Sequence, residues 1–187
     1  MTLRVLPVTP DRWDDMCALF ERSGPRGGHR NVPAYGCWCM YWRDRSLDHG
    51  EPKKQAMKKL VRAGREPGLL AYDDADEPVG WVSVGPREEF SAILRSPQYR
   101  PREAGGGDSV WSLVCFTVDK SAQRRGVAAV LLEAAVEHAF ARGASSLEAY
   151  PHRTEATNYM GHVDLFERAG FVPVRETSKR VVMRLER

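Results

Sequence analysis

The pattern of apolar and polar positions along the 187-residue chain predicts an alternation of strands and helices. Short apolar runs bounded by turn residues predict strands over 3–8, 68–72, 79–84, 110–118 and 146–150, and a final hairpin whose strands begin at 170 and 180. Apolar positions at helical spacing predict helices after Thr9, after Pro52, between Gly126 and Gly143 and over 160–169, with a short one over 88–94.

The order of these segments predicts how the sheet is built. The strand, helix and strand between 110 and 150 predict a parallel pair joined by a crossover. The turn at 73–78 and the C-terminal segment predict antiparallel hairpins instead. The chain has no internal repeat and no linker-like stretch, so its length predicts one domain over 1–187. We therefore expect a mixed α/β sheet.

The segment over 110–143 carries the most informative chemistry. An apolar strand ends at Val118, a polar loop follows, and Gly126 opens the long helix. The first turn of a helix presents backbone N–H groups without intrahelical partners, together with the positive end of the helix macrodipole. Arg124 and Arg125 add charge just before that turn. This order of strand, cationic loop and helix start predicts a pyrophosphate-binding site. The alternative is an ordinary solvated turn with two surface arginines.

The same loop resembles a motif of a known family. Residues 123–128, Gln-Arg-Arg-Gly-Val-Ala, are similar to the Gln/Arg-x-x-Gly-x-Gly/Ala motif of the GNAT (Gcn-five-related) acetyltransferases. Val118, at the end of the preceding strand, fits the same pattern. Residues 165–171, Leu-Phe-Glu-Arg-Ala-Gly-Phe, resemble the Leu-Tyr-x-x-x-Gly-Phe that commonly ends the last helix of these proteins. The chain contains neither a Gly-x-Gly-x-x-Gly nor a P-loop pattern.

The resemblance implies a GNAT-like fold, with a central mixed sheet of six to seven strands flanked by about four helices. It also implies acetyl-CoA as the cosubstrate, with the pantetheine arm along the end of strand 110–118 and the pyrophosphate on the loop. Carried over residue by residue, the cofactor-binding residues are Phe116, Thr117, Val118, Gln123, Arg124, Arg125, Gly126, Val127, Ala128 and Ala129.

Two positions depart from the family pattern. Phe166 stands where many members carry a tyrosine that protonates the departing thiolate, so Tyr159, two turns earlier, is the candidate replacement. Ser112 stands where some members carry a catalytic glutamate. Because the strand over 110–118 contains no carboxylate, the general base must come from elsewhere or be water.

The first candidate base is Glu148, on the strand beside the cofactor strand. Burial among apolar neighbours would suit a carboxylate to this task. The alternative is a strand-edge glutamate that faces solvent. Glu89 and Glu88, after the strand over 79–84, are the next candidates, and His152 is the third.

Four aromatic residues and two thiols occur together over 35–42. The resemblance places this segment between the first two helices, which generally wall the acceptor pocket. Trp38, Tyr41 and Trp42 are therefore candidate acceptor-binding residues, through apolar or cation–π contact. The alternative is that these aromatic side chains pack in the hydrophobic core beneath the preceding glycine-rich loop.

Other chemically reactive residues have structural interpretations. Cys115 lies between apolar neighbours in a central strand, which predicts a buried inert thiol rather than an acyl-accepting nucleophile. His138 lies at the edge of the apolar stripe of its helix and is predicted to be structural. We expect no metal, because a zinc site would need ligands at irregular spacing: Cys17, His29, Cys37 and Cys39.

Composition narrows the class of protein further. The formal net charge is only +3, so we expect no nucleic-acid partner. No apolar run approaches the roughly 20 residues that span a bilayer, and the N-terminus lacks a signal-peptide core, so we expect no membrane association. The four cysteines do not form a disulfide-framework pattern, which predicts a cytoplasmic protein.

These observations predict an acetyl-CoA-dependent N-acetyltransferase in which an amine of a small molecule or protein attacks the thioester directly. Two alternatives stay open. One is a catalytically degenerate GNAT domain that binds acyl-CoA as a sensor or regulatory module, and the other is a regulatory partner protein without a cofactor. Ser112 and Phe166 stand where family members carry catalytic groups, and their presence favours the degenerate-domain alternative. The sequence does not name the acceptor amine, and it leaves a homodimer open.

Overall fold

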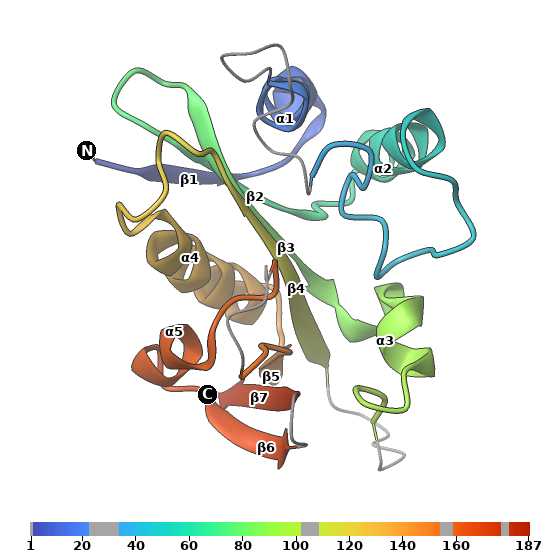
Figure 1. The fold of residues 1–187 in the computed structure, drawn as a ribbon, viewed down its shortest axis with the longest axis vertical. Helices are drawn as coiled ribbons and strands as arrows, with labels where there is room; N and C mark the ends of the chain where they lie inside the picture. Colours follow the sequence, from blue (N-terminus) through green and yellow to red (C-terminus); the bar gives the residue numbers. More distant parts are fainter. Residues whose placement is uncertain (1, 23–33, 102–108, 154–158, 177–179) are drawn as a thin grey trace.

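The computed structural model describes residues 2–22, 34–101, 109–153, 159–176 and 180–187. Within these ranges the chain forms a seven-stranded sheet in the order β1-β2-β3-β4-β5-β7-β6 (Figure 1). Among the seven strands of the described ranges, only β4 and β5 pair in parallel, which confirms the predicted mixed sheet and crossover. The strands are β1 (Arg4–Pro7), β2 (Gly68–Tyr72), β3 (Pro78–Pro86), β4 (Val110–Val118), β5 (Ser146–Ala149), β6 (Val172–Glu176) and β7 (Val181–Glu186).

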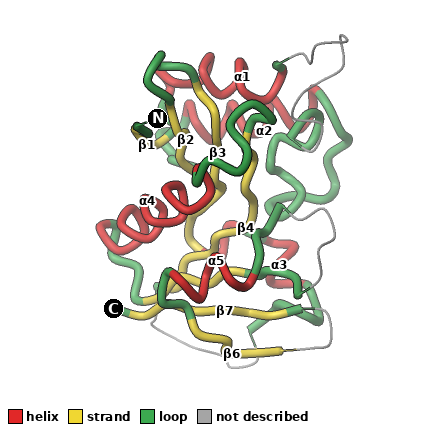
Figure 2. The backbone as a smooth tube through the Cα atoms, turned by 60° about the vertical axis from the view of Figure 1, so that its left-hand side comes forward, coloured by secondary structure: helices red, strands yellow, loops and turns green. Residues whose placement is uncertain are grey.

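Helices cover both faces of this sheet. α4 and α5 lie on one face, and α1, α2 and α3 lie on the other (Figures 1 and 2). Their bounds are α1 (Trp13–Glu21), α2 (Glu51–Arg62), α3 (Ser91–Arg95), α4 (Val127–Ala141) and α5 (Val163–Arg168), with short 3-10 turns η1 (Pro10–Arg12) and η2 (Arg87–Glu89) before α1 and α3. None of these helices is long and apolar enough to cross a membrane, as judged over the described residues.

Two helices differ from the prediction. The helix expected over 160–169 begins only at Val163, because Gly161 has a φ of 82° and interrupts helical backbone. The inward side of the second helix is centred on Met57, whose long side chain reaches the core beneath α1. The helical spacing after Pro52 predicts Ala56, Leu60 and Val61 on the inward face, but of these three only Val61 is fully buried.

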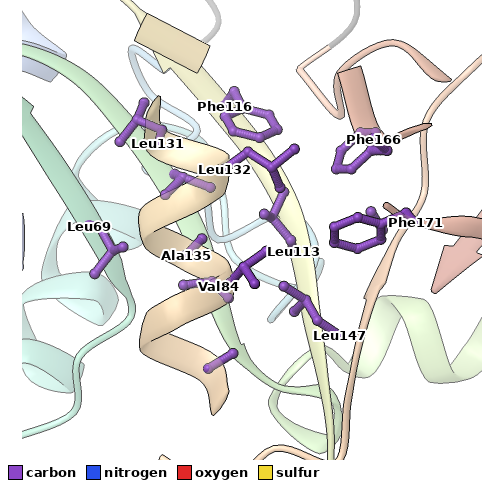
Figure 3. Close-up of a cluster of buried hydrophobic side chains, with 14 of the residues drawn as sticks. Leu69, Val84, Leu113, Phe116, Leu131, Leu132, Ala135, Leu147, Phe166 and Phe171 are labelled. Carbon is purple, nitrogen blue, oxygen red and sulfur yellow. The ribbon is translucent and has the colours of Figure 1, made fainter. Parts of the chain in front are cut away.

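The alternation of side chains along β2 sorts the apolar residues into two cores. Leu69 and Ala71 face α4, whereas Leu70 and Tyr72 face α1 and α2. A smaller core lies beneath α3. Figure 3 shows the core on the α4 side, which includes Leu69, Val84, Leu113, Leu131, Ala135, Leu147 and Phe166.

β4 bends in its middle, and this bend positions the candidate site. In the β3–β4 ladder the register shifts by one residue at Val114, which has no opposite residue on β3. A β-bulge of this kind bends a strand and increases its twist. The parallel β4–β5 ladder ends with Leu113 opposite Ala149, while β4 continues to Val118. The two strands therefore diverge at the carboxyl end of the parallel pair, where sheets of this type bind ligands.

His138 of α4 is buried and belongs to the packing rather than to the site. Its ring packs edge-on against Trp111, with centroids 5.9 Å apart, and Arg142 Nη1 lies 3.1 Å from its Nδ1. Burial and the positive charge of Arg142 lower the pKa of His138 from 6.5 to about 4, although Glu66, 3.7 Å from Nε2, acts in the opposite direction.

This lowered pKa predicts how stability depends on pH. Between pH 6.5 and about 4 the unfolded chain binds a proton at His138 that the folded chain does not, so the free energy of unfolding falls as the pH drops through this window. We expect His138→Phe to flatten this part of the profile, measured by urea unfolding across the pH range. His49→Gln, at an exposed position, is the control. The same slope in the wild type and in His138→Phe would contradict the assignment.

Candidate active site

The loop between β4 and α4 is held by a buried carboxylate, Asp119. Its Oδ1 accepts hydrogen bonds from the backbone N–H and the hydroxyl of Ser121, at 2.8 and 2.6 Å, and Arg22 Nη1 lies 3.4 Å from Oδ2. The N–H of Asp119 donates to the carbonyl of Val79 at 2.9 Å, which ties the start of the loop to β3. This side-chain-to-backbone turn fixes the start of the loop, and residues 123–126 are exposed.

α4 begins directly after Gly126, whose φ of 82° lies in the left-handed region that favours glycine. A Cβ built on Gly126 would meet no atom within 4 Å, so the space beside the first helical turn is open. Gln123, Arg124 and Arg125 are exposed around it. On the inner side, a Cβ on Gly80 would lie 2.7 Å from a side chain of α4, so the helix start packs closely on β3. The turn exposes the helix N-terminus and two guanidinium groups to solvent, as a pyrophosphate-binding site requires.

The end of β4 is less open than the sequence predicts. The resemblance predicted free backbone over 116–118 for a pantetheine arm. In the structure the N–H of Phe116 donates to the carbonyl of Tyr159 at 2.5 Å. The chain that follows β5 therefore returns across the diverging end of β4 and pairs with one of the expected donors. Thr117 and Val118 pair with β3 on the other edge.

Phe166 and Tyr159 lie near this strand end in different environments. Phe166 is fully buried, and its ring centroid lies 6.2 Å from that of Phe116 and 5.4 Å from that of Phe171 (Figure 3). It therefore contributes packing at the position where many family members have a proton donor. Tyr159 is 42% exposed, and its backbone contact with Phe116 keeps it beside β4.

A row of polar residues crosses the opposite face of the sheet. Ser112 lies opposite Glu148 in the β4–β5 ladder, and Glu148 lies opposite Arg184 in the β5–β7 ladder. Glu148 is only 4% exposed. Its Oε1 accepts a hydrogen bond from Arg184 Nη2 at 2.8 Å, and its Oε2 accepts one from Arg87 Nη1 at 3.2 Å. The Tyr150 hydroxyl donates to the same Oε2 at 3.1 Å and lies 2.7 Å from Ser112 Oγ.

The surroundings of Glu148 correct the prediction made from its sequence neighbours. The carboxylate neither faces solvent nor lies among apolar groups, because two arginines from other strands approach it. Burial, and then the charge of Glu148, raise the pKa of Tyr150 well above its ordinary value, so the phenol remains a donor. The result is a buried carboxylate that is hydrogen-bonded at both oxygens.

Glu89, the second candidate base, is also held by arginines. Arg43 and Arg65 pair with its two oxygens, and the buried Arg43 donates to the carbonyl of Pro67 at 3.2 Å. Burial raises the pKa of Glu89, but the charges and hydrogen bonds of Arg43 and Arg65 outweigh it, so the pKa is lowered. A lowered pKa makes Glu89 a weaker base, and its contacts favour a structural role.

The remaining candidate bases have different surroundings. Glu88 is exposed. His152 contacts Arg180, and burial together with the charge of Arg180 lowers its pKa. Neither side chain joins the polar row through a hydrogen bond within the described ranges.

The aromatic segment divides into a buried and an exposed part. Trp38 is 2% exposed and stacks between Trp13 and Phe20, at centroid distances of 5.7 and 5.2 Å. This packing corrects the interpretation of Trp38 as an acceptor-binding residue and favours the alternative that it packs in the hydrophobic core. Tyr41 is 40% exposed and packs edge-on against the half-buried Trp42 at 4.9 Å, so these two residues remain candidates.

The thiols of Cys39 and Cys115 lie in contact between β4 and the aromatic segment over 35–42. Their sulfur atoms are 3.3 Å apart, and Trp81 Nε1 donates to Cys39 Sγ at 3.2 Å. Cys115 is half-buried rather than fully buried as predicted. Of the zinc ligands considered, His29 lies outside the described residues, and no group of three metal-ligating side chains occurs in the described part of the chain.

Sequence reasoning missed three members of the polar row: Arg87, Tyr150 and Arg184. Tyr150 carries a signal, because it follows Glu148 by two residues at the end of a strand and alternation places both on one face. No sequence signal identifies the two arginines, because Arg87 and Arg184 lie 61 and 36 positions from Glu148 along the chain.

Comparison with known proteins identifies the family. Residues 34–171 match the acetyltransferase (GNAT) family, and the chain belongs to this family. The suspected membership is therefore confirmed. Among curated proteins, no sequence matches the chain.

Solved structures share the fold at low sequence identity. The GNAT domain of S. lividans PAT is 20% identical, with a TM-score of 0.60 over 100% of this chain and 92% of that one. A GCN5-related N-acetyltransferase from Kribbella flavida is 17% identical, with a TM-score of 0.61 over 99% and 98%. PaiA N-acetyltransferase from Thermoplasma acidophilum, solved in complex with coenzyme A, is 12% identical, with a TM-score of 0.55 over 100% of both chains. These likenesses confirm the predicted GNAT-like fold.

Proposed function

We propose that the protein is an acetyl-CoA-dependent N-acetyltransferase that transfers an acetyl group to an amine of a small molecule or a protein. The observation that carries this proposal is the open turn at 123–126, which begins α4 beside the diverging end of β4. Membership of the acetyltransferase family and the coenzyme A complex of the PaiA protein support it. The four free cysteines support a cytoplasmic location.

The proposed cosubstrate site uses mainly backbone groups. The N–H groups at the start of α4, over 126–128, face the pyrophosphate, and Arg124 and Arg125 contribute charge. The N–H of Ala129 already donates to the carbonyl of Gly126 at 3.0 Å. Thr117 and Val118 supply the strand end along which the pantetheine arm lies. Because Phe116 already donates to Tyr159, the arm pairs beyond that residue or displaces the Tyr159 carbonyl.

The reaction requires a neutral amine, whose nitrogen attacks the thioester carbonyl carbon. A C–N bond forms, the C–S bond breaks, and the thiolate takes up a proton. Holding the two reactants together is worth roughly 7–11 kcal/mol. A well-placed base adds about 10²–10⁴-fold. The enzyme can therefore work with a base of modest strength.

Glu148 is the proposed proton acceptor, directly or through a water. A carboxylate has about four lone-pair sites, and hydrogen bonds from Arg87, Arg184 and Tyr150 occupy three of them. The remaining site can accept a proton from the incoming ammonium. Tyr159 is the proposed donor to the thiolate, because it is exposed beside the end of β4.

We expect Glu148→Gln to lower kcat by about 10²-fold and to change the acid limb of the pH–rate profile, with an unchanged KM for acetyl-CoA. Steady-state kinetics across the pH range checks this. Urea unfolding is measured alongside, because the substitution leaves Arg87 and Arg184 without their buried partner. Glu176→Gln, which removes an exposed partner of Arg153, is the control. A folded Glu148→Gln variant with normal kcat and pH profile would contradict the role of Glu148 as general base. It would indicate that water accepts the proton from the amine.

An acyl-CoA sensor is the second candidate function. The buried Phe166, the Phe116–Tyr159 hydrogen bond and the two arginines on Glu148 favour it, because each weakens an element of the chemistry. A sensor binds acetyl-CoA with the same loop but does not turn it over.

A screen of amines with a free-thiol readout separates these functions. The enzyme releases CoA thiol in proportion to one class of amine and only slowly without amine. Binding of acetyl-CoA in calorimetry without amine-dependent release would favour the sensor. Absence of binding would overturn both and favour a partner protein without a cofactor.

A further inference from the structure

A cavity of about 550 Å³ lies on the α3 side of the sheet, beside the polar row. Its volume is within the range of small-molecule sites. The loop that carries Tyr99 contributes to its wall, as do β5, β6 and β7. The lining residues that matter here are Arg87, Tyr99, Glu148, Arg175, Val182 and Arg184.

The cavity is rich in guanidinium groups. Arg87 follows β3, Arg175 belongs to β6 and Arg184 belongs to β7, so three separate elements direct arginines toward one space. Glu148 is the buried carboxylate among them. Glu186 also lines the cavity and lies 3.6 Å from Arg184 Nη1, but it is 71% exposed and therefore a weak partner.

Arg184 has a donor that its present partners do not use. Its two terminal nitrogens contact Glu148 and Glu186. Its Nε is buried and has no hydrogen-bond acceptor within the described residues. A buried charged donor without an acceptor is unfavourable. Arginine presents its donors in a planar fork that matches a carboxylate.

Glu148 connects the cavity to the cofactor strand. Hydrogen bonds lead from its carboxylate through the Tyr150 hydroxyl to Ser112 of β4. A molecule in the cavity can therefore place a cationic amine at the carboxylate and an anionic group at the arginines.

We infer that the acceptor is a small amine that also carries a carboxylate, and that Arg175 and Arg184 bind this carboxylate while Glu148 receives the amine. This inference rests on the proposed transferase function and narrows its acceptor class. It assigns substrate specificity to Arg175, which lines the cavity and donates to the carbonyl of Arg100 at 2.7 Å.

The test compares matched acceptors that differ only in charge. The standard L-amino acids, β-alanine and 4-aminobutyrate are each assayed beside the corresponding carboxamide, with acetyl-CoA and a free-thiol readout. We expect kcat/KM for at least one acid to exceed that of its amide by about tenfold or more, as for a charged hydrogen bond. Arg175→Gln should remove this preference through KM for the acid, with KM for acetyl-CoA unchanged. Arg4→Gln, on β1 at the far end of the sheet, is the control.

Binding of the acids and amides is measured in parallel by calorimetry in the presence of CoA. Failure of the carboxylate-binding inference can then be distinguished from failure of the proposed transferase function. Turnover of amides and acids at equal efficiency would overturn this inference and leave the transferase intact. Acid binding that is lost in Arg175→Gln, without any turnover, would support the cavity assignment and overturn the transferase. If neither acids nor amides bind or react, or if Arg175→Gln retains the preference for acids, the inference is wrong.

Discussion

Gly126→Val is expected to abolish measurable acetyl-CoA binding, a loss of at least about 10²-fold. Gly126 opens α4 with a φ of 82°, and its missing side chain leaves the space in front of the helix N-terminus open. A valine side chain would fill that space and hold the pyrophosphate away from the N–H groups. Several charge-assisted hydrogen bonds would be lost together, each worth roughly 1.5–3 kcal/mol. Calorimetric titration with acetyl-CoA checks the prediction.

The other end of the same helix supplies a matched control. Gly143 has a φ of 83°, and a Cβ built on it also meets no atom within 4 Å. Gly143→Val therefore introduces the same backbone strain, about 1–2 kcal/mol, away from the proposed site. Gly143→Val should bind acetyl-CoA like the wild type. Normal binding by Gly126→Val, or an equal loss in both variants, would contradict the site assignment.

Trp38→Ala is expected to destabilise the protein by about 3–5 kcal/mol, which lowers the melting temperature by about 6–20 °C. Trp38 stacks between Trp13 and Phe20, and the ammonium of Lys54 lies 5.2 Å from its ring centroid. Removal of the indole leaves a cavity between α1 and α2 that these rings cannot refill. Thermal unfolding measures the effect.

Tyr41→Ala is the companion variant, because Tyr41 belongs to the same segment and is exposed. It should leave the melting temperature nearly unchanged and raise the KM of the acceptor amine. A Trp38→Ala variant with normal stability and a selectively raised acceptor KM would restore the acceptor role of Trp38.

Local patterns predicted the fold because each element carries its own signal. Short apolar runs bounded by turn residues predicted β2 and β3, and apolar spacing between Gly126 and Gly143 predicted α4. The loop at 123–126 was predictable for the same reason, since its strand, cationic turn and helix are contiguous in sequence. The shorter α5 was not predicted, because the left-handed backbone at Gly161 depends on the path of the chain over β4.

The chemistry across the sheet was harder to predict because it depends on strand register. Glu148 was singled out from its position, but its pairing with Ser112 and Arg184 follows from the β4–β5 and β5–β7 ladders. Sequence neighbours therefore gave it an apolar environment that the fold replaces with guanidinium groups. Trp38 presented a similar ambiguity, because aromatic side chains suit either a pocket or a core. Only the packing of α1 against its ring decides between them.

The central claim is that this chain moves an acetyl group from acetyl-CoA to an amine nitrogen. The most direct measurement incubates the protein with ¹³C-labelled acetyl-CoA and the amine panel and follows the label by mass spectrometry. We predict that the label appears in an N-acetyl product of an amine and that Gly126→Val abolishes this product while Gly143→Val does not. Label found only in free acetate, or only in unchanged acetyl-CoA, would contradict the claim.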